Sequence, residues 1–217
     1  MVAAETFVTE LDAKNQASIQ RVLTALMSGI APEKEAFEVP DVLRLCIKVA
    51  MEAAEVAALW VTDSADLDMK LSLAEQCGDG ARQVRRLVAR LGALGVTSYD
   101  PRDGGYSKLF AFLRSLQTPE ERSSAGYLTG KALSVARLGT LADFCAEKGD
   151  TETARLLDDE ILTQERRYYD EGRQALVTHA ANEESQARAR RAAYRTLELA
   201  TEMVEPLQLR KLTQKRK

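Results

Sequence analysis

The sequence predicts an all-α protein, and three of its properties support this fold class. The 217 residues are 45% hydrophobic but only 6% aromatic. Only 12 glycines and 5 prolines are present, which is few of the turn residues that a sheet protein needs. Apolar residues recur at spacings of three and four over long stretches, as they do in amphipathic helices. A chain of this length can bury a sizeable core as one helical domain with appended helices.

The N-terminal part, residues 1–40, is expected to hold one helix and a linker. An amphipathic stretch runs from about Glu10 to Met27. The segment from Pro32 to Pro40 then separates this stretch from the rest of the chain. We therefore expect the first helix to pack as an appendage on the bundle that follows.

The next two helices are predicted to form a hairpin. Asp41 follows Pro40 and can cap a helix that continues through Val61. The short turn Asp63–Asp66 leads into a second helix that continues to about Leu94. Because such a short link leaves the chain little room, the two helices are predicted to be antiparallel neighbours.

The segment from Gly95 to Gln117 is the longest irregular stretch and is the natural crossover between two hairpins. A short helix is expected within it at Leu109–Leu113. The run Thr118–Glu121 then supplies an N-cap threonine, a proline at the first helical position and a glutamate at the third. This run predicts the start of a third long helix.

A second hairpin and a final helix complete the predicted fold. The third helix is expected to end at about Lys148, where Gly149 can stop it and Asp150 can cap a fourth helix to about Ala180. The C-terminal part, residues 181–217, is predicted to hold a helix from Asn182 to about Val204 and a basic tail. Five positive charges lie among the last eight residues of this tail, which is expected to be solvated.

Two segments carry a resemblance to a known family. The helix that ends near Leu94 contains Gly80-x-x-Gln83, within the segment from Leu71 to Leu87. The helix that ends near Ala180 contains Glu165-x-x-Tyr168, within the segment from Ile161 to Leu176. These segments resemble the second and fourth helices of ferritin-like di-iron bundles, in which a Glu-x-x-His pair stands at each place. The resemblance covers residues 41–180 and implies a ferritin-like four-helix bundle made of two antiparallel hairpins with a long crossover.

The resemblance also implies that the di-iron site is degenerate. Such a site needs one carboxylate from each of two helices and a Glu-x-x-His pair from each of the other two. The helix predicted at residues 41–61 offers Glu52 or Glu55, and the helix predicted at residues 150–180 keeps Glu165, but Gly80 and Gln83 replace one whole pair. Tyr168 replaces the second histidine, and helix three has no acidic residue between Glu121 and Asp143. Lys131 stands where some family members place the third glutamate.

An unpaired carboxylate inside a bundle is unfavourable, so loss of the metal calls for a replacement positive charge or for neutral hydrogen-bond donors. We hypothesise that Lys131 or Arg137 neutralises Glu55 or Glu165. Gln83 and Tyr168 are the expected hydrogen-bond partners. The alternative is that Lys131 lies on the exposed face of its helix.

Other chemistry in the bundle core has weaker support. A single hard cation such as magnesium is conceivable only if the relevant carboxylates converge, which spacing does not show; these are Glu52, Glu55, Asp79 and Glu165. The sole histidine, His179, falls at the end of helix four and is expected to be a surface or capping residue. Glycines within the helices indicate either close packing or room for an apolar ligand, with close packing favoured; they are Gly78, Gly80, Gly130 and Gly172.

Composition narrows the remaining function classes. Cys46, Cys77 and Cys145 are far apart and are expected to be reduced residues of the core. No apolar run is long enough to span a bilayer and the N-terminus does not resemble a signal peptide, so a cytoplasmic protein without membrane contact is expected. The net charge of −3 gives no reason to expect nucleic acid as a partner.

The preferred interpretation is a ferritin-like protein that has lost its di-iron site, has no cofactor and acts by binding. Its ligand is expected to be a partner protein or a small apolar molecule in the bundle core, and the resemblance implies a homodimer. The alternative is an oxygen-activating metalloenzyme of the hydroxylase or N-oxygenase type, with iron or another divalent metal at Glu52, Glu55 and Glu165. Iron storage fits least well, because its ligands are absent. No catalytic residue is identified.

Overall fold

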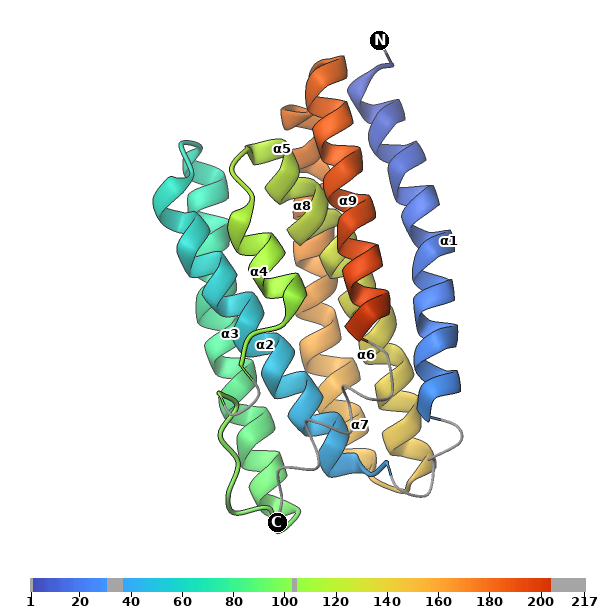
Figure 1. Cartoon of the computed structure of the whole chain (residues 1–217). Helices are drawn as coiled ribbons and strands as arrows, with labels where there is room; N and C mark the ends of the chain where they lie inside the picture. Colours follow the sequence, from blue (N-terminus) through green and yellow to red (C-terminus); the bar gives the residue numbers. More distant parts are fainter. Residues whose placement is uncertain (1, 31–36, 103–104, 204–217) are drawn as a thin grey trace.

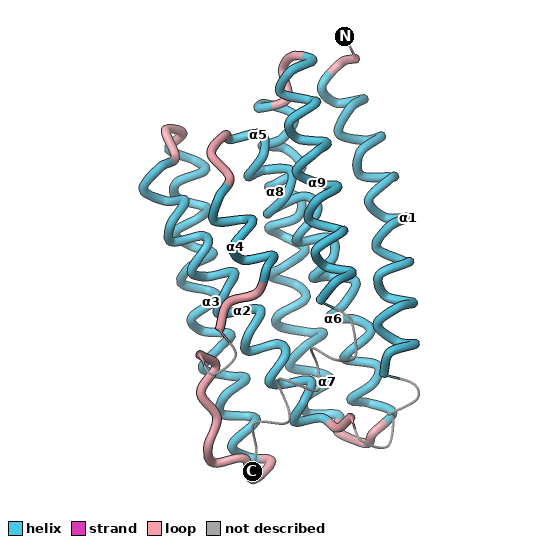
Figure 2. The backbone as a smooth tube through the Cα atoms, viewed as in Figure 1, coloured by secondary structure: helices cyan, strands magenta, loops and turns pink. Residues whose placement is uncertain are grey.

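The computed structural model describes residues 2–30, 37–102 and 105–203, and within these ranges the chain is helical without a strand (Figure 2). The first hairpin consists of α2 (Val39–Asp63) and α3 (Leu67–Ala93). Both helices start at capped residues. Asp41 accepts a hydrogen bond from the Glu38 amide at 3.1 Å, and the Asp66 side chain accepts one from the amide of Asp68 at 3.1 Å. These contacts explain why the predicted hairpin forms where it does.

The second hairpin is longer and contains two π-helical segments. Its first arm is continuous from α5 (Pro119–Arg122) through η2 (Ser123–Thr129) to α6 (Gly130–Glu147). Its second arm is continuous from α7 (Thr151–Arg155) through η3 (Leu156–Leu162) to α8 (Thr163–His179). The turn between the arms uses Gly149 at a φ of +82°, a backbone conformation that favours glycine.

The crossover between the hairpins carries a short helix, α4 (Lys108–Ser115), which lies against α2 and α9 (Figure 1). The Ser107 hydroxyl caps α4 by accepting a hydrogen bond from the Phe110 amide at 3.0 Å. Phe110 is buried, so α4 closes one side of the bundle core.

Helices α1 (Ala4–Ile30) and α9 (Glu183–Met203) lie side by side along the second hairpin (Figure 1). The first helix begins at Ala4, six residues before the predicted Glu10, because Phe7 and Val8 are buried in a cluster with Leu128 and Leu176. The part of the predicted linker at residues 31–36 and the basic tail beyond Met203 lie outside the described residues.

The described helices include none that is long and apolar enough to cross a membrane. The three cysteines are free, with Cys46 and Cys145 buried and Cys77 half-buried. His179 ends α8 as expected, but it is half-buried, and its Nδ1 lies 2.9 Å from the Ser123 hydroxyl. Burial lowers the pKa of this histidine.

Candidate functional site

Five of the positions that the sequence singled out converge around one small cavity between the two hairpins. The cavity measures about 40 Å³, and its walls include Gly80 and Gln83 from α3, Lys131 from α6, and Glu165 and Tyr168 from α8. All five residues are buried. These five residues therefore lie around one point in space, although they come from segments far apart in the sequence.

Lys131 and Glu165 form a buried ion pair. The Lys131 ammonium donates to Glu165 Oε1 at 2.9 Å, and the two residues are only 5% and 7% exposed. The same ammonium lies 5.1 Å from the centroid of the Tyr168 ring, within range of a cation–π interaction. The prediction that Lys131 neutralises Glu165 is confirmed, and its placement on an exposed face is wrong.

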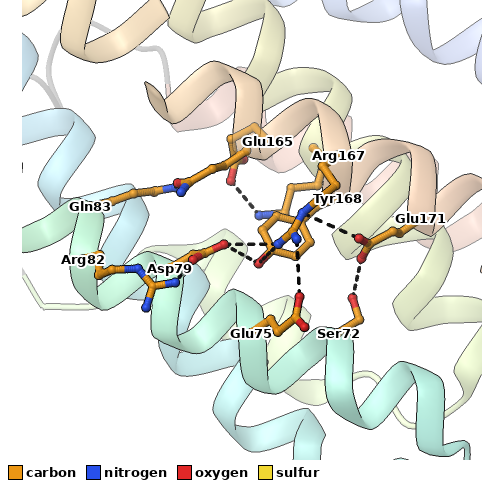
Figure 3. Close-up of polar contacts among 11 residues, drawn as sticks. Ser72, Glu75, Asp79, Arg82, Gln83, Glu165, Arg167, Tyr168 and Glu171 are labelled. Atoms are coloured by element: carbon orange, nitrogen blue, oxygen red, sulfur yellow. Dashed lines mark hydrogen bonds and ion pairs between the residues drawn. The ribbon is translucent and has the colours of Figure 1, made fainter. Parts of the chain in front are cut away.

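Tyr168 and Gln83 have partners other than the expected ones. The Tyr168 hydroxyl donates to Asp79 at 2.7 Å and accepts from Arg167 at 2.8 Å, and Figure 3 shows these three side chains pointing toward one another. Gln83 donates to the Gln164 side chain at 2.9 Å. Burial, together with the hydrogen bond to Asp79, raises the pKa of Tyr168, so this phenol is neutral at physiological pH.

Asp79 belongs to a wider polar network at the α3–α8 contact. Its buried carboxylate forms ion pairs with Arg82 and Arg167. Arg167 also pairs with Glu75 and Glu171, and the Ser72 hydroxyl donates to Glu171 at 2.6 Å (Figure 3). These contacts join α3 to α8 and leave the Asp79 carboxylate compensated.

Glu52 and Glu55 lie apart from the small cavity and have different surroundings. Glu52 is buried and accepts hydrogen bonds from the Ser107 amide at 2.8 Å and the Ser107 hydroxyl at 2.6 Å. Its carboxylate also lies 3.3 Å from the Lys48 ammonium. Glu55 is half-buried, and its carboxylate raises the pKa of the Tyr106 phenol. Glu52 therefore anchors the start of α4 to α2.

The residues that are present do not fit a di-iron centre. Glu165 is bound by Lys131 and Glu52 by Ser107 and Lys48, while Gly80, Gln83 and Tyr168 replace three of the expected ligands. Across the described ranges, no three His, Cys, Asp or Glu side chains are grouped so that they could share a metal ion. No three of the carboxylates considered for a single hard cation are therefore grouped around one point.

Gly80 serves close packing between α2 and α3. A Cβ built on Gly80 would lie 2.7 Å from the Cβ of Ala54, a separation that side chains do not tolerate. Gly172 is similar, because a Cβ there would overlap the Cβ of Tyr127. Gly78 faces only the Arg82 side chain. Gly130 lines a second cavity, and a Cβ there would lie 2.9 Å from the carbonyl oxygen of Ala125. The close-packing interpretation thus holds for Gly80, Gly130 and Gly172.

This second cavity, of about 90 Å³, adjoins the small one and is lined mainly by apolar side chains. It lies between α2, α4 and the second hairpin, and Ala53, Lys131, Arg137 and Glu165 line both cavities. Its apolar walls include Val56, Trp60, Phe110, Leu113, Tyr127 and Leu133. The π-helical segment η2 supplies Tyr127 to this wall, and π-helical turns are frequent at functional sites.

Three buried polar atoms in residues that line the larger cavity have no hydrogen-bond partner among the described residues. They are the indole Nε1 of Trp60, the amide Oε1 of Gln76 and the hydroxyl of Tyr127. Sequence reasoning missed all three residues, although Gln76 falls three residues after Leu73 and four before Gly80 on the apolar stripe of its helix. Because buried polar groups are nearly always hydrogen-bonded, unpartnered donors and acceptors at the same cavity indicate space for a polar guest.

Comparison with known proteins gives no name to this arrangement. No family model matches the chain, and neither curated proteins nor solved structures match it.

Proposed function

We propose that this protein is a ferritin-like bundle without a metal site, which binds a small, largely apolar molecule in the cavity between α2, α4 and the second hairpin. The observation that carries the proposal is the group of unpartnered polar atoms, Trp60 Nε1, Gln76 Oε1 and the Tyr127 hydroxyl, in an otherwise mainly apolar lining. A guest with one polar group would satisfy them, and apolar cavities with a few convergent polar groups are typical ligand sites.

Two further observations support the ferritin-like part of the proposal. Two helical hairpins are joined by a crossover that runs along the bundle (Figure 1). The positions of the degenerate motifs also line one cavity, where a family member would hold its metals. The Lys131 ammonium now supplies the positive charge that Glu165 needs.

Ligand binding can be tested with a cavity-filling variant. Ala53 lines both cavities, so Ala53→Leu fills space there, whereas Ala58 on the same helix is exposed and Ala58→Leu serves as the control. Titration calorimetry with hexanol and benzyl alcohol should give binding to the wild type and to Ala58→Leu, and at least about tenfold weaker binding to Ala53→Leu. Equal affinity in all three proteins, or no binding to the wild type, would overturn the proposal.

The absence of a metal site is tested separately. Protein purified from iron-supplemented cells should contain iron at well below one equivalent per chain by elemental analysis. About two equivalents per chain, lost in a Glu165→Gln variant, would favour the oxygen-activating metalloenzyme instead.

We also propose a homodimer through a bundle face, as the ferritin-like resemblance implies. Light scattering coupled to size-exclusion chromatography should give about twice the 23.9 kDa mass of one chain. A mass of one chain across the micromolar range would contradict it.

A further inference from the structure

Arg137 is a half-buried cation that forms no ion pair in the described ranges. Its side chain lines both cavities, and burial lowers the pKa of its guanidinium. No carboxylate of the described ranges lies within 4.0 Å of this guanidinium, and none of the hydrogen bonds in those ranges involves it. An arginine stays protonated even when buried, so it brings to the cavities a positive charge that has no direct ion pair.

The other charges at these cavities are already paired. Lys131 pairs with Glu165, and Glu52 pairs with Lys48. Asp79 pairs with Arg82 and Arg167. Glu165 interacts electrostatically with Arg137, but the Glu165 carboxylate forms its ion pair with the Lys131 ammonium, at 2.9 Å.

The neighbouring thiol does not supply a counter-charge either. Cys46 interacts electrostatically with Arg137 and lines the smaller cavity. Burial raises the pKa of Cys46 to about 11, so its sulfur carries no charge at neutral pH. Among the charged residues that line the two cavities, Arg137 is therefore the one without an ion pair in the described ranges.

We propose that the natural ligand is a small monocarboxylate with an apolar body, whose carboxylate pairs with Arg137. This inference rests on the proposed ligand-binding function and names the ligand class. The planar guanidinium can donate two parallel hydrogen bonds to a carboxylate, and the buried Ser134 hydroxyl lines the same two cavities. Val56, Trp60 and Phe110 offer the surface that an aromatic ring or a short alkyl chain would cover.

Size and charge both favour a monocarboxylate over a larger or more highly charged anion. An apolar cavity of about 150 Å³ holds one benzene molecule, and the adjoining cavities of about 90 and 40 Å³ are together somewhat smaller, so the apolar body of the ligand is limited to a single ring or a short chain. One unpaired guanidinium balances one negative charge, whereas a phosphate dianion would leave a second charge buried without a partner.

The test compares carboxylates with neutral molecules of the same shape. Calorimetric titration of the wild type should show that benzoate and hexanoate bind at least about tenfold more tightly than benzyl alcohol and hexanol, with no binding of inorganic phosphate. Arg137→Met should remove this preference while the neutral ligands keep their affinity. Arg85→Met, at an exposed arginine of α3, is the control and should behave as the wild type.

Each outcome separates the two proposals. If the neutral molecules bind as tightly as the carboxylates, or if Arg137→Met keeps the preference, this inference fails while ligand binding stands. If neither class binds, both fail. Should Arg137→Met not fold, NMR of the arginine Nε–H groups in the wild type replaces it, with Arg137→Lys used for assignment. The Arg137 signal should shift on addition of benzoate, and an unchanged signal would overturn the inference.

Discussion

Two neighbouring parts of the bundle core differ in whether their buried polar groups have hydrogen-bond partners. In the polar network at the α3–α8 contact, Asp79 is satisfied by Tyr168, Arg82 and Arg167, and Gln83 by Gln164. At the larger cavity, four groups have no hydrogen-bond partner within the described ranges: Trp60 Nε1, Gln76 Oε1, the Tyr127 hydroxyl and the Arg137 guanidinium.

This difference separates structural polar groups from groups that await a ligand. In a fully paired network every polar group has a hydrogen-bond partner, so removing one member destabilises the protein. Unpartnered polar groups destabilise the ligand-free protein, and they gain hydrogen bonds when a ligand binds. Substitutions of the same kind in the two parts should therefore have opposite effects on stability.

The largest effect is expected from the two inward-facing cations of α6. Lys131→Met leaves the Glu165 carboxylate buried without a counter-ion and should lower the free energy of unfolding by about 3–5 kcal/mol. Arg137→Met removes a charge that has no partner, so the free energy of unfolding should change by less than about 1 kcal/mol or rise. Urea unfolding at pH 7 measures both.

The paired double variant provides the control. Lys131→Met combined with Glu165→Gln removes both charges and should recover most of the stability lost in the single variant. If Arg137→Met is as damaging as Lys131→Met, the contrast between paired and unpaired groups is wrong.

The next largest change in stability is expected at Tyr127, a residue in the wall of the larger cavity. Gly172→Ala places a Cβ against the Cβ of Tyr127, so α8 and η2 must move apart at a cost of about 1–3 kcal/mol. Gly139→Ala is the matched control in α6, because its added Cβ meets only Leu162 Cδ1 at 3.9 Å. That control should gain about 0.5–1 kcal/mol from helix propensity alone. Thermal unfolding of the two variants should shift in opposite directions, and a shift in the same direction would contradict the close contact.

Much of the helical pattern could be predicted because its signals are local. Thr118 and Glu121 form the capping box that the sequence indicated at the start of the third helix, and Asp150 caps the fourth by accepting a hydrogen bond from the Thr153 amide at 2.9 Å. The π-helical segments were not predicted, because widening one turn changes no composition or apolar spacing that a sequence displays. One of them, η2, positions Tyr127.

One part of the site, the partner of Glu165, could be predicted because the middle of the third helix lacks acidic residues. Because the third helix has no acidic residue between Glu121 and Asp143, a positive charge or neutral donors were expected beside Glu165, and Lys131 lies there. The role of Asp79 was missed because Arg167 and Tyr168 lie 88 and 89 residues away in sequence, and only the packing of α3 on α8 joins them. The unpartnered atoms of the larger cavity depend on where α4 lies, which no local pattern fixes.

The smallest effect is the most direct comparison of the two parts, because it uses one substitution at two glutamines of α3. Gln83→Leu leaves the half-buried Gln164 side chain without its donor and should lower the free energy of unfolding by about 1 kcal/mol. Gln76→Leu removes a buried carbonyl oxygen that has no partner, so stability should be unchanged or rise by up to about 1 kcal/mol. Chemical unfolding of both variants measures this difference.

Titration with benzyl alcohol supplies a second measurement on the same two variants. The gain in stability of Gln76→Leu should accompany weaker binding, since the Gln76 oxygen is proposed to accept a hydrogen bond from the ligand, whereas Gln83→Leu should leave affinity unchanged. Equal losses of stability at both glutamines would mean that Gln76 is a structural residue and that the larger cavity awaits no polar group there.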